Sequence, residues 1–495
     1  MAEWSHHIRI ADGGREIVAI DDFRIADSCI TVLFGESGIG KSLSALAICG
    51  LLDPDELSVR IDGRPYQSYL ESDRVAEIRQ NGFFVFQEPS SHLNPLLTLQ
   101  EQLNEGSIAA ATDEANILGR LWKGGDPKDV QKILRVYPKP YRPSGGEKQR
   151  ILAAMAFKKL SAVDPKISGS LFVFDEPTGN LDNNLRNAFL DFLVENFRQR
   201  AMTVLLITHD YSMVSRLSKA YPDLTKRIHY KELTLNRGSL QLRDFLPQEF
   251  FAWIQQLRPP AVSPTGDNVL LSMEPELSVF GRKFLITRDE GRDRPAPLQV
   301  RKGRLSYLKA PSGMGKTTLL KAMMGLVKPD SMKMRLGGTE YNERTPRREW
   351  QEHVWGQVMT MVFQHADEAL NQNSDVCGVF DGLPIPPSVD EGAVARMLLQ
   401  LFEEIPEGFM HKQVKYLSGG QKQRLNLLRS TVLETDILLL DEPLNGLDFA
   451  SSMKVVGKVE EKLRAGKGVL VVSHNEEIFD TLVAADDVYY LGERV

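Results

Sequence analysis

The sequence contains little cysteine and no long apolar run. Cys29, Cys49 and Cys377 are the only cysteines among 495 residues, and their spacing matches neither a metal site nor a redox pair. Such sparse cysteine usage favours a reducing compartment. No apolar stretch approaches the roughly 20 residues that a membrane-spanning helix needs, and the N-terminal residues lack a basic, apolar signal segment. We therefore expect any membrane role to be peripheral and to depend on a partner.

An excess of basic charge is also missing. The chain has 60 lysines and arginines against 66 aspartates and glutamates, which gives a formal net charge of −6. This balance argues against a nucleic-acid-binding protein as a whole, so no nucleic acid is among the expected partners. With 42% hydrophobic and 25% charged residues, the composition is typical of a soluble globular protein, and the length predicts two or more domains.

The segment Gly35–Ser42, GESGIGKS, fits the Gly-x-x-x-x-Gly-Lys-Ser pattern of a phosphate-binding loop. The apolar run 30–34 before it predicts a buried strand, and residues 43–52 after it predict a helix. Glycines allow backbone N–H groups to surround phosphate oxygens, and the helix N-terminus adds partial positive charge. We expect Lys41 to reach the β- and γ-phosphates of a nucleotide, and the Ser42 hydroxyl to bind Mg²⁺.

The motifs of the first half recur, in the same order, in the second half. Each half has a phosphate loop, a Phe-Gln pair at a strand end, a Ser-Gly-Gly helix start, an apolar strand ending in Asp-Glu-Pro, and a strand ending in histidine. Lys41 and Lys316 are 275 positions apart, and His209 and His474 are 265 apart. A nearly constant spacing over five motifs indicates duplication of a whole domain.

The two halves are joined by a Pro-rich, polar stretch. Residues 258–267 read RPPAVSPTGD, a composition typical of a linker. We predict one domain at 1–245, a linker at 246–267 and a second domain at 268–495.

These motifs resemble those of tandem ATP-binding-cassette (ABC) ATPases, and the resemblance covers nearly the whole chain. The family signature Leu-Ser-Gly-Gly-Gln is intact at Leu417–Gln421 and occurs as Pro143–Glu147 in the first half. The resemblance implies an α/β fold with two P-loop NTPase domains. Each is expected to have a RecA-like α/β core, an antiparallel β subdomain and an inserted α-helical subdomain, the last at about 88–143 and 365–417.

The resemblance also implies cofactors and site residues. In the family two cassettes pair head to tail around ATP and Mg²⁺, so we expect an intramolecular cassette dimer. Glutamates following the magnesium-binding aspartates would polarise the attacking water, and the histidines would contact the γ-phosphate. The catalytic candidates are Glu176, Glu442, His209 and His474. The metal-binding candidates are Ser42, Gln87, Asp175, Thr317, Gln364 and Asp441. The cofactor-binding candidates are Gly35, Ser37, Gly38, Gly40, Lys41, Ser42, Gln87, Ser144, Gly145, Gly146, Asp175, Ser312, Gly313, Gly315, Lys316, Thr317, Thr318, Gln364, Ser418, Gly419, Gly420 and Asp441.

The sequence departs from the family pattern at three places. Ala310 replaces the first glycine of the second phosphate loop, where a Cβ is expected to tighten the loop. Pro143 replaces the leucine of the first signature. Neither change removes a catalytic group, so two competent sites are expected. For the adenine-stacking aromatic, Phe280 is the candidate in the second half, whereas Ala11 takes that place in the first.

A finer resemblance lies after the first glutamine. Residues 87–95, QEPSSHLNP, resemble the Gln-Glu-Pro-x-x-x-Leu-Asn-Pro stretch of dipeptide, oligopeptide and nickel importer ATPases, where it lies beside the groove for the membrane subunit. Residues 364–372 match less well. Leu93 is therefore a docking candidate, with a place in the core as the alternative.

The resemblance implies the energising subunit of a prokaryotic ABC importer at the cytoplasmic face of the inner membrane. Two transmembrane permease subunits and a solute-binding protein would be its partners, and peptides, nickel or other chelated metals, or related small solutes its cargo. A soluble tandem ATPase acting on ribosomes or DNA is the first alternative, although the short joint and the missing zinc-binding cysteines disfavour it. An ABC exporter is the second alternative.

Overall fold

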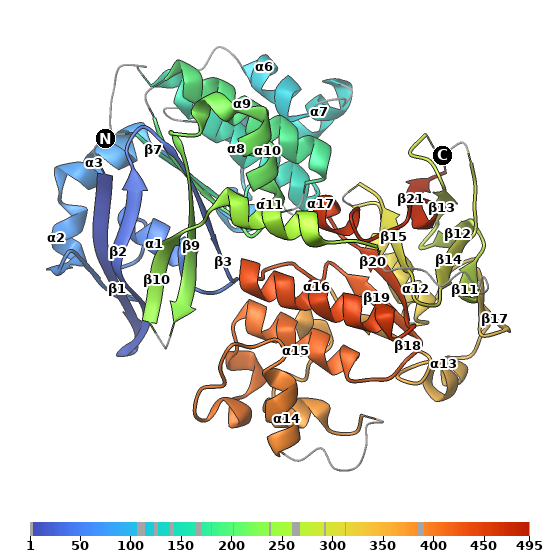
Figure 1. The fold of residues 1–495 in the computed structure, drawn as a ribbon. Coiled ribbons are helices and arrows are strands. Elements are labelled where there is room, and N and C mark those ends of the chain that lie inside the picture. Colours follow the sequence, from blue (N-terminus) through green and yellow to red (C-terminus); the bar gives the residue numbers. More distant parts are fainter. Residues whose placement is uncertain are drawn as a thin grey trace. The chain divides into compact units, whose positions relative to one another are not determined.

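The computed structural model describes residues 3–105, 114–122, 127–138, 143–163, 170–179, 181–200, 202–236, 239–259, 268–291, 294–311, 313–383 and 391–494. The chain divides into two compact units, Met1–Phe251 and Ala252–Val495 (Figure 1). Each unit contains parallel strand pairs, antiparallel strand pairs and helices.

The first unit contains a ten-stranded sheet in the order β5-β4-β1-β2-β10-β9-β3-β8-β7-β6. Its parallel part runs from β9 to β6, and its remaining pairs are mainly antiparallel. The strands are β1 (Glu3–Asp12), β2 (Arg15–Ala26), β3 (Ile30–Gly35), β4 (Ser58–Ile61), β5 (Arg64–Pro65), β6 (Phe83–Val85), β7 (Leu171–Asp175), β8 (Thr203–Ile207), β9 (Ile228–Asn236) and β10 (Ser239–Asp244).

Strands β3, β8 and β7 are the three middle strands of the parallel part of this sheet, and every residue in them is buried. Continuous apolar runs of this kind suit parallel strands that are covered on both faces. The carboxyl ends of the three strands meet at one edge, where Leu33 and Asp175 both pair with Ile207. The phosphate loop, the acid pair and the histidine all follow these ends, as expected for parallel α/β sheets.

The helices of the first unit include the predicted helical insertion. The segment predicted at 88–143 holds α4 (Pro89–His92), α5 (Leu99–Leu103), α6 (Glu114–Leu121) and α7 (Pro127–Leu134) in its described parts. The other helices are α1 (Lys41–Ile48), α2 (Tyr66–Leu70), α3 (Asp73–Asn81), α8 (Gly145–Ala162), α9 (Asn183–Gln199) and α10 (Ser212–Ala220). Helix α11 (Pro247–Gln256) crosses the boundary between the units and falls inside the stretch predicted as a linker.

The second unit repeats the parallel core. Its seven-stranded sheet has the order β12-β13-β21-β15-β20-β19-β18, in which β21-β15-β20-β19-β18 corresponds to β9-β3-β8-β7-β6. A separate four-stranded antiparallel sheet has the order β14-β11-β16-β17. The strands are β11 (Val269–Met273), β12 (Glu276–Val279), β13 (Arg282–Thr287), β14 (Leu298–Arg301), β15 (Leu305–Lys309), β16 (Lys333–Leu336), β17 (Thr339–Asn342), β18 (Met359–Val362), β19 (Ile437–Asp441), β20 (Gly468–Val472) and β21 (Val488–Glu493). The predicted fold class is thereby confirmed in both halves.

The second unit has two cores, one on each face of its parallel strands. Leu438 and Leu440 of β19 belong to one core, and Ile437 and Leu439 belong to the other, because successive side chains of a strand point to opposite faces. Its helices are α12 (Lys316–Met323), α13 (Arg347–His353), α14 (Glu391–Leu398), α15 (Gly419–Thr431), α16 (Phe449–Arg464) and α17 (Glu476–Phe479). The segment predicted as helical at 365–417 contains α14 and short 3₁₀ helices in its described parts.

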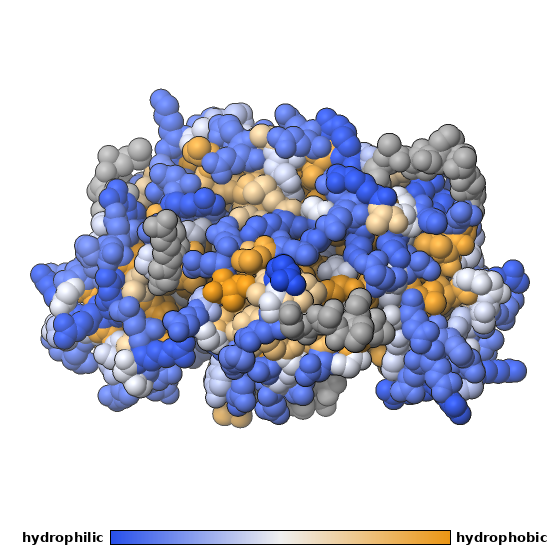
Figure 2. All heavy atoms as spheres, turned by 60° about the horizontal axis from the view of Figure 1, so that its bottom comes forward, coloured by the Kyte–Doolittle hydropathy of each residue, from blue (hydrophilic) through white to orange (hydrophobic). Residues whose placement is uncertain are grey.

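The face in Figure 2 is mainly hydrophilic, with apolar side chains exposed in small areas. Among the helices in the described ranges, none is both long and apolar enough to cross a bilayer.

Candidate nucleotide and catalytic sites

The first phosphate loop is a tight backbone cradle. Gly35, Gly38 and Gly40 have φ angles of +144°, +81° and +109°, which side-chain-bearing residues rarely adopt. A Cβ on Gly35 would lie 2.6 Å from the carbonyl oxygen of Leu233, and one on Gly40 would lie 2.7 Å from Cγ2 of Val18. Only glycine therefore fits at these two positions.

A buried lysine is enclosed by each loop. Lys41 begins helix α1, and its Nζ donates hydrogen bonds to the carbonyl oxygens of Gly35 at 2.7 Å and Glu36 at 2.9 Å. Lys316 begins α12 and donates to the carbonyl oxygen of Ala310 at 2.7 Å. Both ammonium groups thus lie within the loops, where a phosphate would meet a charge already positioned by carbonyl groups.

The second loop accommodates its alanine by a different local backbone. Gly313 and Gly315 retain positive φ angles, whereas Ala310 is not among the non-glycine residues with positive φ. Its side chain packs half-buried against the core, together with Met314. An alanine is possible there because the backbone does not need the conformation of Gly35. The candidate Ser312 lies outside the described residues.

The acid pairs follow strands β7 and β19 in the same geometry. Asp175 and Asp441 are buried last residues of these strands. Glu176 and Glu442 both have φ of +47°, an unusual conformation for glutamate. Their amides donate to the carbonyl oxygens at the ends of β8 and β20, at 3.0 and 2.9 Å. The same strained backbone at two equivalent positions makes both glutamates candidates for a functional site, because strain costs about 1–3 kcal/mol.

The aspartates fit a cation. Within the described residues, Asp175 Oδ1 and both carboxylate oxygens of Asp441 are buried without a hydrogen-bond partner. Burial raises the pKa of Asp175 to about 6, although a Ser42 hydrogen bond and the Lys41 charge lower it. Burial likewise raises the pKa of Asp441. Unsatisfied, buried carboxylate oxygens beside a hydroxyl are the oxygen ligands that Mg²⁺ prefers.

The glutamates and histidines lie together, but in different arrangements. His209 Nδ1 and Glu176 Oε1 are 2.8 Å apart in the first unit. Burial lowers the pKa of His209, but the charge and hydrogen bond of Glu176 outweigh it and the pKa is raised. In the second unit, the His474 ring nitrogen Nε2 lies 3.2 Å from Lys316 Nζ and 3.5 Å from Glu442 Oε1.

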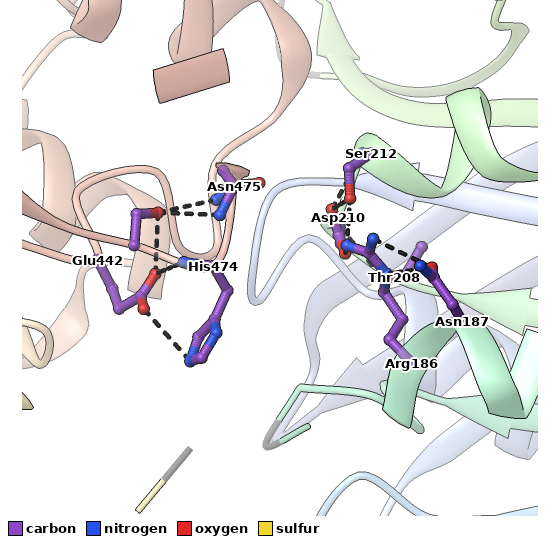
Figure 3. A network of polar contacts seen from close by, with 9 residues as sticks. Arg186, Asn187, Thr208, Asp210, Ser212, Glu442, His474 and Asn475 are labelled. Atoms are coloured by element: carbon purple, nitrogen blue, oxygen red, sulfur yellow. Dashed lines mark hydrogen bonds and ion pairs between the residues drawn. The ribbon is translucent and has the colours of Figure 1, made fainter. Parts of the chain in front are cut away.

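In the second unit, Glu442 accepts hydrogen bonds from the residues that follow β20. The Ser473 hydroxyl and the His474 amide both donate to Glu442 Oε2 at 3.1 Å (Figure 3). Burial raises the pKa of Glu442 to about 7, against the lowering influence of the Lys316 charge and these hydrogen bonds. A carboxyl with a pKa near neutrality is suited to take up a proton from water.

Gln87 and Gln364 follow strands β6 and β18, and the signature serines precede helices α8 and α15. Gln364 Oε1 accepts a hydrogen bond from the Thr317 hydroxyl at 3.4 Å, whereas Gln87 is exposed. Ser144 and Ser418 are the N-caps of α8 and α15, each in a capping box with the residue three positions later. The glycines after each serine start the helix, so their N–H groups are available for an anion. Pro143 is buried, as is Leu417 at the equivalent place.

Sequence reasoning missed the residues that join the signature helices to the Phe-Gln strands. Gln149 Nε2 donates to the carbonyl oxygen of Phe86 at 3.3 Å, and Gln423 Nε2 donates to that of Phe363 at 3.4 Å. Both glutamines are five positions after the signature serine, and both are buried. Their identical place in the two halves was the signal that could have found them.

The adenine candidate stands on an exposed hairpin. Phe280 is 73% exposed, and Arg282 in the same β12–β13 hairpin donates to the carbonyl oxygen of Gly313 at 3.3 Å. This contact places the hairpin beside the second phosphate loop. In the first unit the equivalent hairpin tip is Gly13-Gly14, while Ala11 lies within β1 and pairs with Glu16. The expectation about Ala11 was therefore wrong in position, because the tip lies two residues later.

The family model described as ABC transporter matches residues 20–179 and 294–445, together more than half of the chain. The chain belongs to the ABC transporter family. Both matched regions contain a phosphate loop, a signature and an acid pair, so this is a tandem ABC ATPase and its enzymatic activity is ATP hydrolysis.

Curated relatives align with nearly the whole chain. The peptidoglycan transport ATP-binding protein YejF of Agrobacterium fabrum is 27% identical over 95% of this chain and 87% of the relative. The glutathione import ATP-binding protein GsiA of Escherichia coli is 24% identical over 94% of this chain and 80% of the relative. Among solved structures, RNase-L Inhibitor has a TM-score of 0.61 at 17% identity and covers 98% of this chain and 89% of its own. That likeness shows the fold.

The geometry explains what the residues of this ABC ATPase contribute. Bound ATP would supply the phosphoryl group, and Mg²⁺ held by Asp175 and Asp441 would neutralise charge on its phosphates. Lys41 and Lys316 lie inside the loops and can exchange carbonyl contacts for phosphate oxygens. Glu176 and Glu442 are placed by their backbone at the strand ends, where each can accept a proton from water. The imidazole beside each glutamate can orient it or hold the developing charge.

Proposed function

We propose that this ABC ATPase energises a prokaryotic importer. The observation that carries the proposal is the alignment of both halves with ATP-binding proteins that are named for glutathione import and peptidoglycan transport. The substrate class follows from those names and from the sequence resemblance to peptide and nickel importers. We infer a peptide, a peptide-like compound or a chelated metal as cargo.

The importer proposal includes roles for the predicted site residues. Glu176 and Glu442 act as general bases, with His209 and His474 at the γ-phosphate. Asp175 and Asp441 hold Mg²⁺ together with Ser42 and Thr317, and the N–H groups of the glycines after Ser144 and Ser418 bind nucleotide phosphate. The buried, partnerless aspartate oxygens and the two glycine cradles support these roles.

A loop beside the first glutamine supports docking to a membrane subunit. Gln102 is buried and holds the loop: its Oε1 accepts from the Asn94 amide at 2.8 Å, and its Nε2 donates to the carbonyl oxygens of Asn94 and Leu97 at 3.0 Å each. Leu96 is 81% exposed at the tip, whereas Leu93 is only 4% exposed. Leu93 therefore has the alternative place expected for it, in the core, and we propose Leu96 as the residue that contacts a partner.

The partners are two permease subunits and a solute-binding protein, with the ATPase at the cytoplasmic face of the inner membrane. The test is co-expression with importer permeases encoded in the same genome, followed by reconstitution in proteoliposomes. We expect the ATPase to copurify with the permeases, and its hydrolysis to rise when the loaded binding protein is added. If the rate of ATP hydrolysis does not change when the permeases and the loaded binding protein are present, the importer proposal is overturned.

The alternative is a soluble tandem ATPase acting on ribosomes or DNA. One solved structure of similar fold is an archaeal ribosome recycling factor, with a TM-score of 0.62 at 17% identity. Sedimentation of the tagged protein from cells separates the two proposals. An importer subunit pellets with membranes and is released when the permeases are deleted, whereas a ribosome factor follows the ribosomal fraction in a nucleotide-dependent manner.

A further inference from the structure

His209, the proposed γ-phosphate contact of the first unit, is called the switch histidine below. The residues on either side of it and after it hydrogen-bond to one another. Asp210 comes directly after His209, and its backbone amide donates to the Thr208 hydroxyl at 3.0 Å. Its carboxylate accepts hydrogen bonds from the amide of Ser212 at 3.0 Å and from the Ser212 hydroxyl. These bonds fix the backbone on both sides of His209.

A buried arginine on helix α9 also takes part in these polar contacts. Arg186 of α9 is 8% exposed, and its Nη1 lies 2.8 Å from Asp210 Oδ2 and also donates to the Ser212 hydroxyl. The other side of the guanidinium donates to Asn187 Oδ1 at 3.2 and 3.3 Å (Figure 3). Burial raises the pKa of the Asp210 carboxyl, but the charge and hydrogen bond of Arg186 and the bonds from Ser212 outweigh it and hold this pKa below its usual range.

The arginine therefore connects helix α9 to the loop after β8. Its own amide donates to the carbonyl oxygen of Asp182, the N-cap of α9, at 2.9 Å. Its side chain reaches the loop whose histidine is 2.8 Å from the proposed base Glu176. A charged hydrogen bond at this distance restrains the orientation of the loop more strongly than a neutral one.

The second unit provides a natural comparison. Ser452 stands four positions after its N-cap Asp448, where Arg186 stands after Asp182, and Asn475 follows His474 where Asp210 follows His209. A charge pair cannot form between serine and asparagine. In that unit the loop is tied to the glutamate itself, because the Ser473 hydroxyl donates to Glu442 and accepts from the Asn475 amide at 3.1 Å.

We propose that Arg186, through Asp210, is a positioning residue that holds the switch histidine of the first ATP site in place for catalysis. It does not touch the reacting atoms. Without it the loop 208–212 loses its link to α9, and the His209 imidazole no longer keeps one orientation relative to Glu176. The second site needs no such residue, because its serine and histidine amide hold Glu442 directly.

Steady-state ATP hydrolysis by the purified full chain carrying Glu442→Gln tests the proposal, because this background removes the proposed base of the second site and leaves the first site as the source of turnover. Arg186→Met and Asp210→Asn should each lower kcat about tenfold, since a catalytic group displaced by a fraction of an ångström loses much of its effect. KM should change less than about twofold, because the phosphate loop is intact. The double variant should lose no more than either single one, since both act through one contact. Arg186→Lys, which keeps the charge, should recover most of the rate.

The chain offers matched controls. Arg198 lies on the same helix and forms an exposed ion pair with Asp223 at 2.8 Å, so Arg198→Met should leave kcat unchanged. Ser452→Ala, at the equivalent position of the second unit, should also leave it unchanged. Equal losses in Arg198→Met and Arg186→Met, an effect confined to KM, or an unchanged kcat in folded Arg186→Met would each overturn the proposal.

A readout without turnover separates positioning from general destabilisation. The ring signals of His209 in a histidine-labelled NMR spectrum can be identified by their loss in His209→Gln. They should move in Arg186→Met and Asp210→Asn and stay in place in Arg198→Met. Unmoved ring signals in folded Asp210→Asn would contradict the proposal, and this variant and Arg186→Lys decide the question if Arg186→Met fails to fold.

Discussion

At the scale of single residues, Glu176 and Glu442 share a strained backbone but differ in their surroundings. The double variant Glu176→Gln/Glu442→Gln keeps size and hydrogen bonding and removes both basic carboxylates. We expect it to bind ATP while its hydrolysis falls by roughly 10²-fold or more, the usual scale for a general base. Glu56 is exposed, so Glu56→Gln is the control. Near-normal hydrolysis by the double variant would show that neither glutamate is the base.

The buried Glu442 also predicts a dependence of stability on pH. Its pKa is about 7 in the folded protein, against 4.5 for an ordinary glutamate, so the unfolded chain binds fewer protons between these values. The free energy of unfolding should therefore fall as pH rises from about 4.5 to 7, by about 3 kcal/mol from this residue. Urea unfolding of the full chain at pH 5 and pH 8 measures the effect.

The comparison variant for this measurement is Glu442→Gln. Other buried carboxyls, such as Asp175, also titrate in this range, so the difference between the wild type and the variant isolates Glu442. The variant should show a flatter dependence on pH. An identical slope in both proteins would mean that Glu442 ionises normally in the folded state.

At the scale of elements, the loop between α4 and α5 contains one buried leucine, Leu93, and one exposed leucine, Leu96. Leu96→Asp should leave thermal stability within about 0.5 kcal/mol of wild type, because the side chain is exposed. It should nevertheless reduce permease-coupled transport at least about tenfold if Leu96 is a central contact. Coupled transport and basal hydrolysis are measured in the same proteoliposomes.

The neighbouring leucine supplies the contrast. Leu93→Asp places a charge in the core and should destabilise the first unit by about 3 kcal/mol or more, visible as a lower melting temperature. Transport that survives Leu96→Asp in a stable protein would place the docking surface elsewhere.

At the scale of the whole molecule, duplication predicts two separate nucleotide sites in one chain. The wild type should trap two nucleotides per chain under conditions that stall hydrolysis. Lys41→Ala and Lys316→Ala should each trap one, because each removes the ammonium group enclosed by one loop. Labelled nucleotide retained per mole of protein gives the count.

Lys328, exposed beyond the end of α12, is the matched control for this count. Lys328→Ala should trap two nucleotides. If Lys41→Ala still trapped two, the first loop would not be a nucleotide site despite its shape.

The sequence by itself determined the fold, the duplication and most of the candidate site. Parallel strands bring their carboxyl ends to one edge, so motifs that follow buried apolar runs meet there without further information. Asp175, Glu176 and His209 are such residues, and their equivalents follow the same strands in the second half. Local pattern was sufficient for these predictions because the strand ends, rather than distant contacts, place the side chains.

Tertiary structure alone decided which way several side chains turn and what they contact. Leu93 and Leu96 are both leucines in one loop, and only the packing around Gln102 buries the first and exposes the second. Arg186 and Asp210 are 24 positions apart and meet through the packing of α9 on the loop after β8. Neither residue belongs to a periodic sequence pattern. Their contact depends on the three-dimensional path of the chain between them, so local sequence does not predict it. The same reason separates Glu176, held by its histidine, from Glu442, held by serine and backbone.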